Sequence, residues 1–181
     1  MISGDSIRVV HPLFHEEGDG AIPISPLQLE FGYCSLSIAK ILNENYHSVL
    51  PDFRIVPGMD AACFAAIFKN MYYAAAIWRN PSSAMIDKTW LELSRFVILP
   101  DSPKNTASRM ISWMTKRIKE KFPACPKLIS YQDPKSHSGT IYKASNWVST
   151  GSRPSGGFSS NNRGRKAEQS PGPKIRWEYS L

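Results

Sequence analysis

The chain has 181 residues with a formal net charge of +7, and 42% of its residues are hydrophobic. Its length favours one domain with a tail, and its apolar content is sufficient for a core. No apolar run approaches the roughly 18–20 residues of a membrane span, the first residues do not form a signal-peptide pattern, and the cysteines form no CxxC pair. These features disfavour a membrane protein, a disulfide scaffold and a zinc knuckle, and they favour a cytoplasmic location.

The first part of the chain predicts an extended segment, a helix and a hairpin. Residues 22–29 contain two prolines and are expected to be extended, as an edge strand would be. A short helix is predicted over residues 35–45, because its apolar residues recur on one side and a serine precedes them. Two hydrophobic runs, residues 61–68 and 71–78, are separated by a Lys-Asn pair, which is typical of a β-hairpin with a two-residue turn.

Residues 90–147 are predicted to form a strand, a long amphipathic helix, a second strand and a short aromatic helix. The first strand covers residues 90–99, and the second covers residues 127–132. Strand, crossover helix and strand in this order predict a right-handed parallel βαβ unit. Arg95 interrupts an apolar face of the first strand that is expected to contain Leu91, Leu93, Val97 and Leu99.

The end of the chain has a different composition. Residues 151–181 carry six cations and two carboxylates among many serines, glycines and prolines. This composition predicts a folded domain over residues 1–151 and a basic, disordered tail over residues 152–181. A basic flexible tail fits contact with nucleic acid, and the alternative is that it only aids solubility.

The βαβ unit should gather polar residues at one edge of the sheet, because loops that follow the carboxyl ends of parallel strands meet on the same side. A strand-to-helix turn also offers backbone N–H groups to an anion. The alternative is that both loops are merely solvated. The residues expected to converge are Asp101, Ser102, Lys104, Asn105 and Ser108 from the first loop, and Tyr131, Asp133, His137, Ser138 and Tyr142 from the second.

Two charged residues of this unit are candidates for a site. A guanidinium in an apolar strand is costly to bury without an anion, so Arg95 is expected to be partly buried against a carboxylate or a substrate phosphate. Asp133 could act as a general base or orient a substrate amine, although Asp before Pro is also an ordinary turn residue. His47, Asp133 and His137 are suitable ligands for iron or zinc, but no metal-motif spacing supports them, so no metal ligand is assigned.

The runs SRFVILPDSPKNTASRMISW and LISYQDPKSHSGTIYKASNW resemble the phage Mom family of adenine-modifying proteins, which are divergent relatives of the GNAT acyltransferases. The upstream segments IPISPLQL and ENYHSVLP are also similar to that family, so the resemblance covers roughly residues 20–151. It implies an α/β fold with a GNAT-like mixed sheet between helices, in which an antiparallel first half leads into the βαβ unit at residues 90–147.

The resemblance also implies roles for particular residues. Many GNAT relatives place a tyrosine after the last strand of this unit, where it protonates a leaving thiolate, and Tyr142 stands at that position. The alternative is that Tyr142 is a packing residue between Ile141 and Ala144. The family usually shows a His-Tyr-Ser order where this chain has Tyr-His-Ser, so the roles of the first two residues stay open. The candidates are Asp133, Tyr142 and Arg95 for catalysis, Lys104, Asn105 and Ser108 for the cofactor, and Tyr46, His47, Ser48, Tyr131 and Asn146 for the substrate.

The cofactor is left open by the sequence. GNAT acyltransferases hold the CoA pyrophosphate with a glycine-containing turn, whereas residues 102–108 contain no glycine. Without glycine the backbone is expected to curl less closely on a pyrophosphate. An acyl-CoA or a related acyl donor is therefore one candidate, and iron or zinc is a weaker one.

The resemblance predicts an acyltransferase-like enzyme that transfers an acetamido- or methylcarbamoyl-type group to the N6 amine of adenine in double-stranded DNA. The modification would protect phage DNA from restriction enzymes in the bacterial host, and the target base would have to leave the stack. Two alternatives are a conventional acetyltransferase that uses acetyl-CoA on a small amine or a protein, and a non-catalytic DNA-binding protein.

Overall fold

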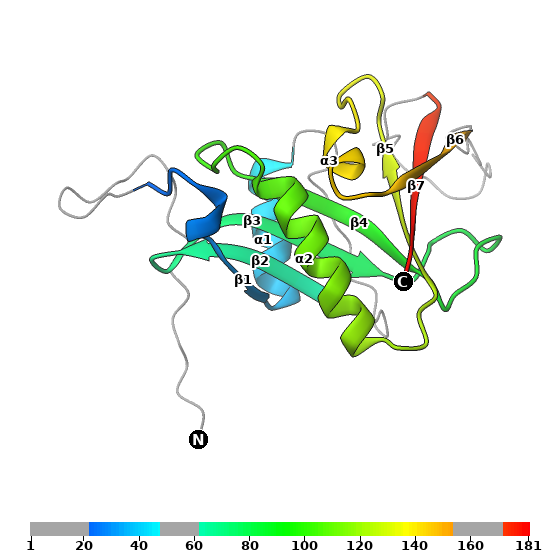
Figure 1. Cartoon of the computed structure of the whole chain (residues 1–181), viewed down its shortest axis with the longest axis horizontal. Helices are drawn as coiled ribbons and strands as arrows, with labels where there is room; N and C mark the ends of the chain where they lie inside the picture. The colour runs from blue at the N-terminus through cyan, green and yellow to red at the C-terminus, as the bar shows by residue number, and fades with distance from the viewer. Residues whose placement is uncertain (1–21, 48–61, 154–171) are drawn as a thin grey trace.

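The computed structural model describes residues 22–47, 62–153 and 172–181. Its strands form one sheet in the order β1-β2-β3-β4-β5-β7-β6, with helix α1 on one face and helices α2 and α3 on the other (Figure 1). In chain order the elements are β1 (Glu30–Tyr33), α1 (Leu36–Tyr46), β2 (Ala62–Phe68), β3 (Met71–Arg79), β4 (Leu91–Ile98), α2 (Thr106–Lys121), β5 (Lys127–Gln132), α3 (Thr140–Lys143), β6 (Val148–Arg153) and β7 (Lys174–Ser180).

The first helix and the hairpin confirm the local sequence patterns. The hydroxyl of Ser35 accepts a hydrogen bond from the backbone N–H of Ile38 at 3.2 Å and so caps α1. Strands β2 and β3 pair antiparallel through a two-residue turn, in which Lys69 and Asn70 have φ angles of 48° and 63°. Positive φ at both positions matches the twist of a hairpin.

The expectation of an extended segment over residues 22–29 was wrong. Pro26–Gln28 forms a 3-10 turn, because Ser25 and Gln28 build a capping box in which each side chain accepts a hydrogen bond from the backbone near the other. The edge strand is instead β1, which pairs antiparallel with β2.

Strand β4 contains a bulge at Ser94. Arg95 pairs with Ile77 and Leu93 pairs with Trp78, so Ser94 has no partner in the ladder, and its hydroxyl donates to the carbonyl oxygen of Ile77 at 3.0 Å. One extra residue reverses the alternation of side chains. The prediction that four apolar residues share one face of this strand was therefore wrong: Leu91 and Leu93 lie in the core beneath α2, whereas Val97 and Leu99 lie in the core beneath α1.

The βαβ unit is confirmed, and its two parallel strands part at their carboxyl ends. Leu91 pairs with Leu128 and Leu93 pairs with Ser130, after which the two strands make no further pair although both continue. Helix α2 packs against the sheet with its apolar stripe, Met110, Ile111, Met114 and Ile118. An opening between β4 and β5 therefore begins at Leu93 and Ser130, next to the bulge.

The C-terminal segment contributes the inner strand β7, which pairs antiparallel with both β5 and β6. Its side chains alternate, so that Trp177, with only 4% exposure, lies in the same core cluster as Tyr142 of α3, with Ile175 and Tyr179 packed against it. The prediction of a disordered tail over residues 152–181 was therefore wrong for residues 152–153, which end β6, and for residues 172–181, while residues 154–171 lie outside the described part of the chain. No helix in the described ranges is long and apolar enough to cross a membrane.

Candidate functional site

A pair of buried hydroxyl groups lies at the point where β4 and β5 part. The Tyr142 hydroxyl is 2.8 Å from the Ser130 hydroxyl, which in turn is 3.5 Å from the carbonyl oxygen of Leu93. Tyr142 and Ser130 are 7% and 2% exposed. Burial raises the pKa of Tyr142, and the hydrogen bond with Ser130 only partly opposes this effect. Tyr142 therefore keeps its proton at neutral pH and can serve as a proton donor.

The loop between β4 and α2 contains a left-handed residue that is not glycine. Asn105 precedes the helix with φ 67° and ψ 4°, and its side chain makes no capping hydrogen bond. Asn tolerates this conformation better than most residues. The loop thus makes its left-handed turn without glycine, and the expectation that it curls less closely on a pyrophosphate stays a prediction. The first-turn N–H groups of α2 remain suited to an anion.

The three candidate cofactor residues surround this helix start. Lys104 and Asn105 are exposed, whereas Ser108 is half-buried. The Ser108 hydroxyl donates to the carbonyl oxygen of Asn105 at 3.2 Å, so Ser108 does not cap the helix. The Ser108 carbonyl oxygen accepts from the hydroxyl of Ser145, just beyond α3, at 3.0 Å. The first turn of α2 thus contacts the residues that follow α3, and the convergence of the two loops of the βαβ unit stays a prediction.

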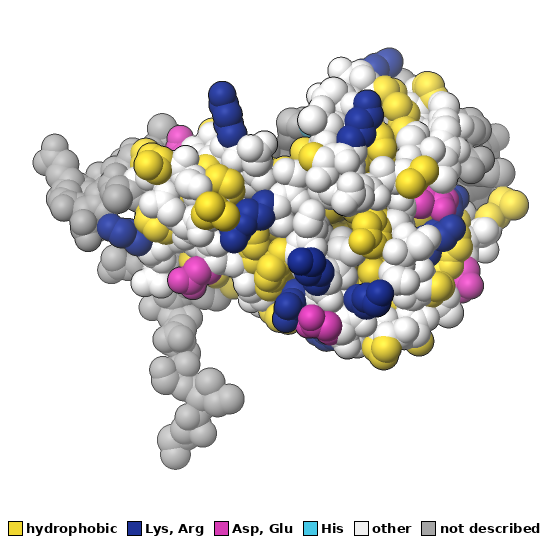
Figure 2. All heavy atoms as spheres, in the orientation of Figure 1, with side chains coloured by type: hydrophobic (Ala, Val, Ile, Leu, Met, Phe, Trp, Pro, Cys, Tyr) yellow, Lys and Arg dark blue, Asp and Glu magenta, His cyan; other side chains and the backbone are white. Residues whose placement is uncertain are grey.

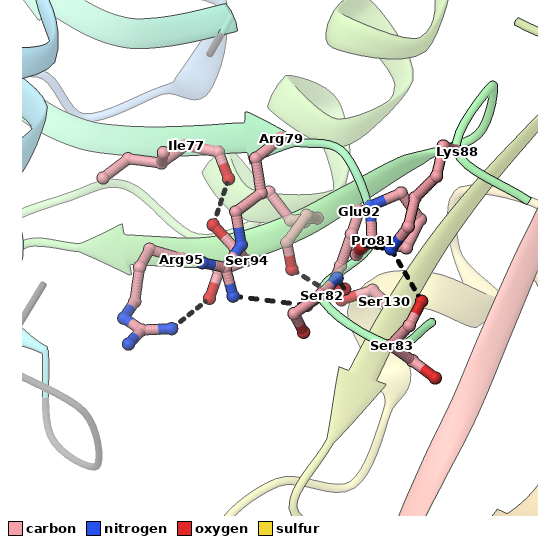
Figure 3. A network of polar contacts seen from close by, with 11 residues as sticks. Ile77, Arg79, Pro81, Ser82, Ser83, Lys88, Glu92, Ser94, Arg95 and Ser130 are labelled. Carbon is pink, nitrogen blue, oxygen red and sulfur yellow. Dashed lines mark hydrogen bonds and ion pairs between the residues drawn. The ribbon is translucent and has the colours of Figure 1, made fainter. Parts of the chain in front are cut away.

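The opposite face of the opening carries Arg95, with His47 and Tyr131 as further polar residues. Because of the bulge, Arg95 projects to the α1 side of β4, where its guanidinium donates to the carbonyl oxygen of Ser94 at 2.7 Å (Figure 3). His47 ends α1, and its pKa is lowered to about 4 by burial and then by the positive charges of Arg95 and His137. The imidazole of His47 is therefore a neutral hydrogen-bonding group at physiological pH. Tyr131 lies on the same face of the neighbouring strand, half-buried and opposite Arg176.

Asp133 forms an ion pair with Lys174 from strand β7, with 2.5 Å between carboxylate and ammonium. The side chains are 8% and 18% exposed, and the second carboxylate oxygen accepts from the backbone N–H of Lys135 at 3.0 Å. Both carboxylate oxygens of Asp133 therefore already accept a hydrogen bond within the protein. The geometry favours an orienting role for Asp133 over direct proton abstraction.

Three further candidates are Asn146, Tyr46 and Ser48. Asn146 is exposed and has a left-handed backbone, with φ 61°, just after α3. Its backbone N–H donates to the carbonyl oxygen of Lys143, and the backbone N–H of Trp147 donates to the carbonyl oxygen of Tyr142, so that the helix ends here. Asn146 therefore has a structural reason to be there. Tyr46 is half-buried, and burial followed by the negative charge of Asp101 raises its pKa. Ser48 lies outside the described residues.

Sequence reasoning missed Ser130, Trp177 and Lys174. Ser130 could have been found as the small hydroxyl residue that alternates with Leu128 on one face of its strand. The other two could have been found by the alternation of polar and apolar residues in the KIRWEYS run. The described ranges contain no group of three or more His, Cys, Asp or Glu side chains that could hold a metal ion. His47, Asp133 and His137 are thus not assembled as a ligand set there.

This sheet, with one parallel pair parting at a bulge and helices on both faces, is the fold of the GNAT acetyltransferases. Similar solved structures include a probable acetyltransferase from Staphylococcus epidermidis (TM-score 0.60, 10% identity, 84% of this chain and 98% of that one) and a GNAT family acetyltransferase from Elizabethkingia anophelis with acetyl-CoA bound (TM-score 0.54, 12% identity, 85% and 99%). The ribosomal-protein-S18-alanine N-acetyltransferase from Escherichia coli is also similar (TM-score 0.56, 10% identity, 84% and 93%).

The sequence itself points to a narrower group. The profile of the Mom protein family matches residues 71–168, which is more than half of the chain. The protein therefore belongs to the Mom family, as the resemblance of its βαβ unit predicted. No curated protein matches the sequence.

Proposed function

We propose that the protein transfers an acetamido- or methylcarbamoyl-type group to the N6 amine of adenine in DNA, which would protect phage DNA from restriction enzymes. The observation that carries the proposal is the pair of buried hydroxyl groups, Tyr142 and Ser130, at the opening of a GNAT-type sheet in a Mom-family chain.

On the donor side, the residues fit an acyl-CoA or a related acyl donor. The start of α2 offers backbone N–H groups beside Lys104, and Asn105 supplies the left-handed turn that lets the backbone approach a phosphate closely. Such a donor, when bound, supplies an activated acyl carbon. Tyr142 holds a proton on its hydroxyl oxygen at the apex of the opening, and donating this proton to a departing group is general acid catalysis.

On the acceptor side, Arg95 and His47 fit a nucleotide. A guanidinium pairs well with a phosphate oxygen, and a neutral imidazole can hydrogen-bond an exocyclic amine. An adenine amine inside a duplex is stacked and paired, so the base would have to be extruded to reach these side chains. Asp133, held by Lys174, would orient the loop that follows β5.

The outer surface is suited to the phosphate backbone of DNA. Lys116, Lys119 and Lys121 are exposed on α2, and Glu120 is the one acidic residue of that helix. Figure 2 shows several Lys and Arg side chains over this helix and few Asp or Glu side chains. Cations in such a row displace counterions from DNA, which gives affinity without sequence preference.

The test is mass spectrometry of nucleosides from host cells that express the full chain. Wild-type protein should produce a modified deoxyadenosine, and Tyr142→Phe should lower its level by about 100-fold or more, as expected for the loss of a general acid. Tyr33→Phe is the matched control, because Tyr33 lies half-exposed on the edge strand β1, away from the opening. Unmodified DNA from host cells that express the wild-type protein would overturn the proposal.

A conventional acetyltransferase is a second candidate, and the left-handed Asn105 favours it because it suits an ordinary CoA pyrophosphate. Purified protein that acetylates a small amine or a protein with acetyl-CoA, while host DNA stays unmodified, would establish this second function. Salt-dependent DNA binding without any modified product would instead indicate a non-catalytic DNA-binding protein.

A further inference from the structure

The C-terminal strand β7 lies beyond the residues that match the family, yet it contacts the proposed proton donor directly. The ring of Trp177 stacks on the ring of Tyr142, with 5.3 Å between centroids and 18° between planes. Both residues are at most 7% exposed. An aromatic stack of this kind restricts where the Tyr142 hydroxyl can lie.

Trp177 makes a second contact on its other edge. Its indole N–H donates to the side-chain oxygen of Gln132 at 2.7 Å, and the side-chain NH₂ of Gln132 donates to the carbonyl oxygen of His137. Gln132 ends β5 and is 4% exposed. Its amide therefore links β7 to the loop of residues 133–139, which also carries Asp133.

Gly139 closes this loop at the same place. A Cβ atom there would lie 2.5 Å from the side-chain oxygen of Gln132 and 2.7 Å from a ring carbon of Trp177, and its φ angle is +74°. Any other residue would thus push the loop away from the Gln132–Trp177 pair. Helix α3 begins at the next residue, so this contact also fixes the start of the helix that carries Tyr142.

Simple core packing would explain the burial of Trp177 but not the arrangement of its polar edge. Burying a glutamine costs free energy unless its amide makes hydrogen bonds. Here the amide oxygen accepts from Trp177 of β7, and the amide nitrogen donates to the carbonyl oxygen of His137 in the loop. One chain of contacts thus joins the Tyr142 hydroxyl, β7 and the acceptor-side loop. A displacement of about 1 Å in such a chain can cost about 100-fold in rate.

We propose that Trp177 and Gln132 are positioning residues: Trp177 fixes the ring of Tyr142, and Gln132 fixes the loop of residues 133–139 relative to it. The C-terminal strand thereby completes the catalytic centre. The inference rests on the proposed function, because it takes Tyr142 as the proton donor. Loss of the stack should impair proton donation, and loss of the Gln132 link should loosen the loop.

The experiment uses three full-length variants and two readouts. Trp177→Leu removes the stack, Trp177→Phe keeps a ring but removes the N–H, and Gln132→Met removes the amide at similar size. The first readout is the tyrosinate absorbance of Tyr142, obtained by subtracting the titration of a Tyr142→Phe background, which requires no donor or DNA. The second is the level of modified deoxyadenosine in host DNA.

Trp177→Leu should lower the pKa of Tyr142 toward that of an ordinary tyrosine, because water reaches the hydroxyl, and should reduce modification by about 10- to 100-fold. Trp177→Phe and Gln132→Met should leave the Tyr142 titration near that of the wild type but reduce modification several-fold. Both variants remove the hydrogen bond between Trp177 and Gln132. The double variant should therefore reduce modification little more than either single variant does. Trp113→Phe, a change in a half-buried tryptophan of α2, is the matched control and should alter neither readout.

The outcomes separate this inference from the proposed function. If the Trp177 and Gln132 variants match Trp113→Phe in both readouts, the positioning role is overturned, even when Tyr142→Phe abolishes modification. If Trp177→Leu does not fold, Trp177→Phe and Gln132→Met still decide the matter through the modification level. Full modification by Tyr142→Phe would overturn the proposed acid role, while the titration would still test the contact between Trp177 and Tyr142.

Discussion

At the scale of single residues, the sequence places Asp133 and Arg95 on the right elements but does not reveal the surroundings of their side chains. Asp133 follows β5 as the sequence predicted, but its partner Lys174 is 41 residues away in sequence and belongs to the C-terminal strand. No local pattern could pair them. Arg95 was expected on an apolar face and lies half-buried, yet the bulge at Ser94 determines which face it occupies.

The ion pair gives a prediction about stability. Asp133→Asn should reduce the free energy of unfolding by roughly 2–4 kcal/mol, because it leaves the largely buried Lys174 ammonium without its countercharge. The double variant Asp133→Asn/Lys174→Met should recover most of this loss, since no unpaired charge remains. Urea unfolding measures both. If the double variant regains stability but not DNA modification, Asp133 acts in the reaction as well as in the fold.

His47 gives a prediction about pH. Its folded-state pKa of about 4 lies below the ordinary value of 6.5, so the unfolded chain binds the proton more tightly. His47 therefore contributes a loss of stability as pH falls from about 6.5 toward 4. Replacing it with Gln should flatten the dependence of the urea midpoint on pH in that window. His137→Gln should shift the NMR titration of His47 upward, because it removes a neighbouring positive charge, and an unchanged titration would contradict the proximity of the two histidines.

At the scale of elements, the sequence predicts what local spacing determines. The hairpin, α1, α2 and the βαβ order follow from turn residues, caps and apolar periodicity within short windows. The bulge at Ser94 and the pairing of β5 with β7 depend on register between distant segments, which no window contains. The candidate site was predictable in so far as it follows the ends of β4 and β5, whereas the contributions of Ser130, Lys174 and Trp177 required the assembled sheet.

The turn before α2 gives a prediction about the donor. Asn105→Gly should preserve affinity for acetyl-CoA, used as the probe, because glycine adopts the left-handed conformation at little cost. Asn105→Val should weaken binding by about 5- to 30-fold, since a β-branched residue there costs about 1–2 kcal/mol. Isothermal titration calorimetry compares the two variants. Equal affinities would show that this turn does not hold the donor, and no binding even by the wild type would point to a different acyl donor.

At the scale of the whole molecule, lysines and arginines are concentrated in two stretches of the sequence. Helix α2 presents exposed lysines on the folded domain, and Arg163, Arg165 and Lys166 occur between the described parts of the chain. Deleting everything after Gly151 would not isolate the second region, because it would also remove β7 from between β5 and β6. Substitution within the full chain tests each region without disturbing the sheet.

The last prediction therefore concerns the salt dependence of DNA binding. The variant Lys116→Gln/Lys119→Gln/Lys121→Gln should reduce the slope of log affinity against log salt by up to about 3. Binding releases about one counterion fewer from the DNA for each cation that the protein has lost. Arg163→Gln/Arg165→Gln/Lys166→Gln removes the same charge and should reduce the slope by a similar amount, since a basic segment contacts phosphates without sequence preference. Fluorescence anisotropy with duplexes of two unrelated sequences measures both variants. Modification at saturating DNA should persist in each, because the lysines of the first set lie exposed on α2 and the second set is expected to supply affinity alone. An unchanged slope for the first variant would remove α2 from the DNA-binding surface, and an unchanged slope for the second would leave the folded domain as the source of the affinity.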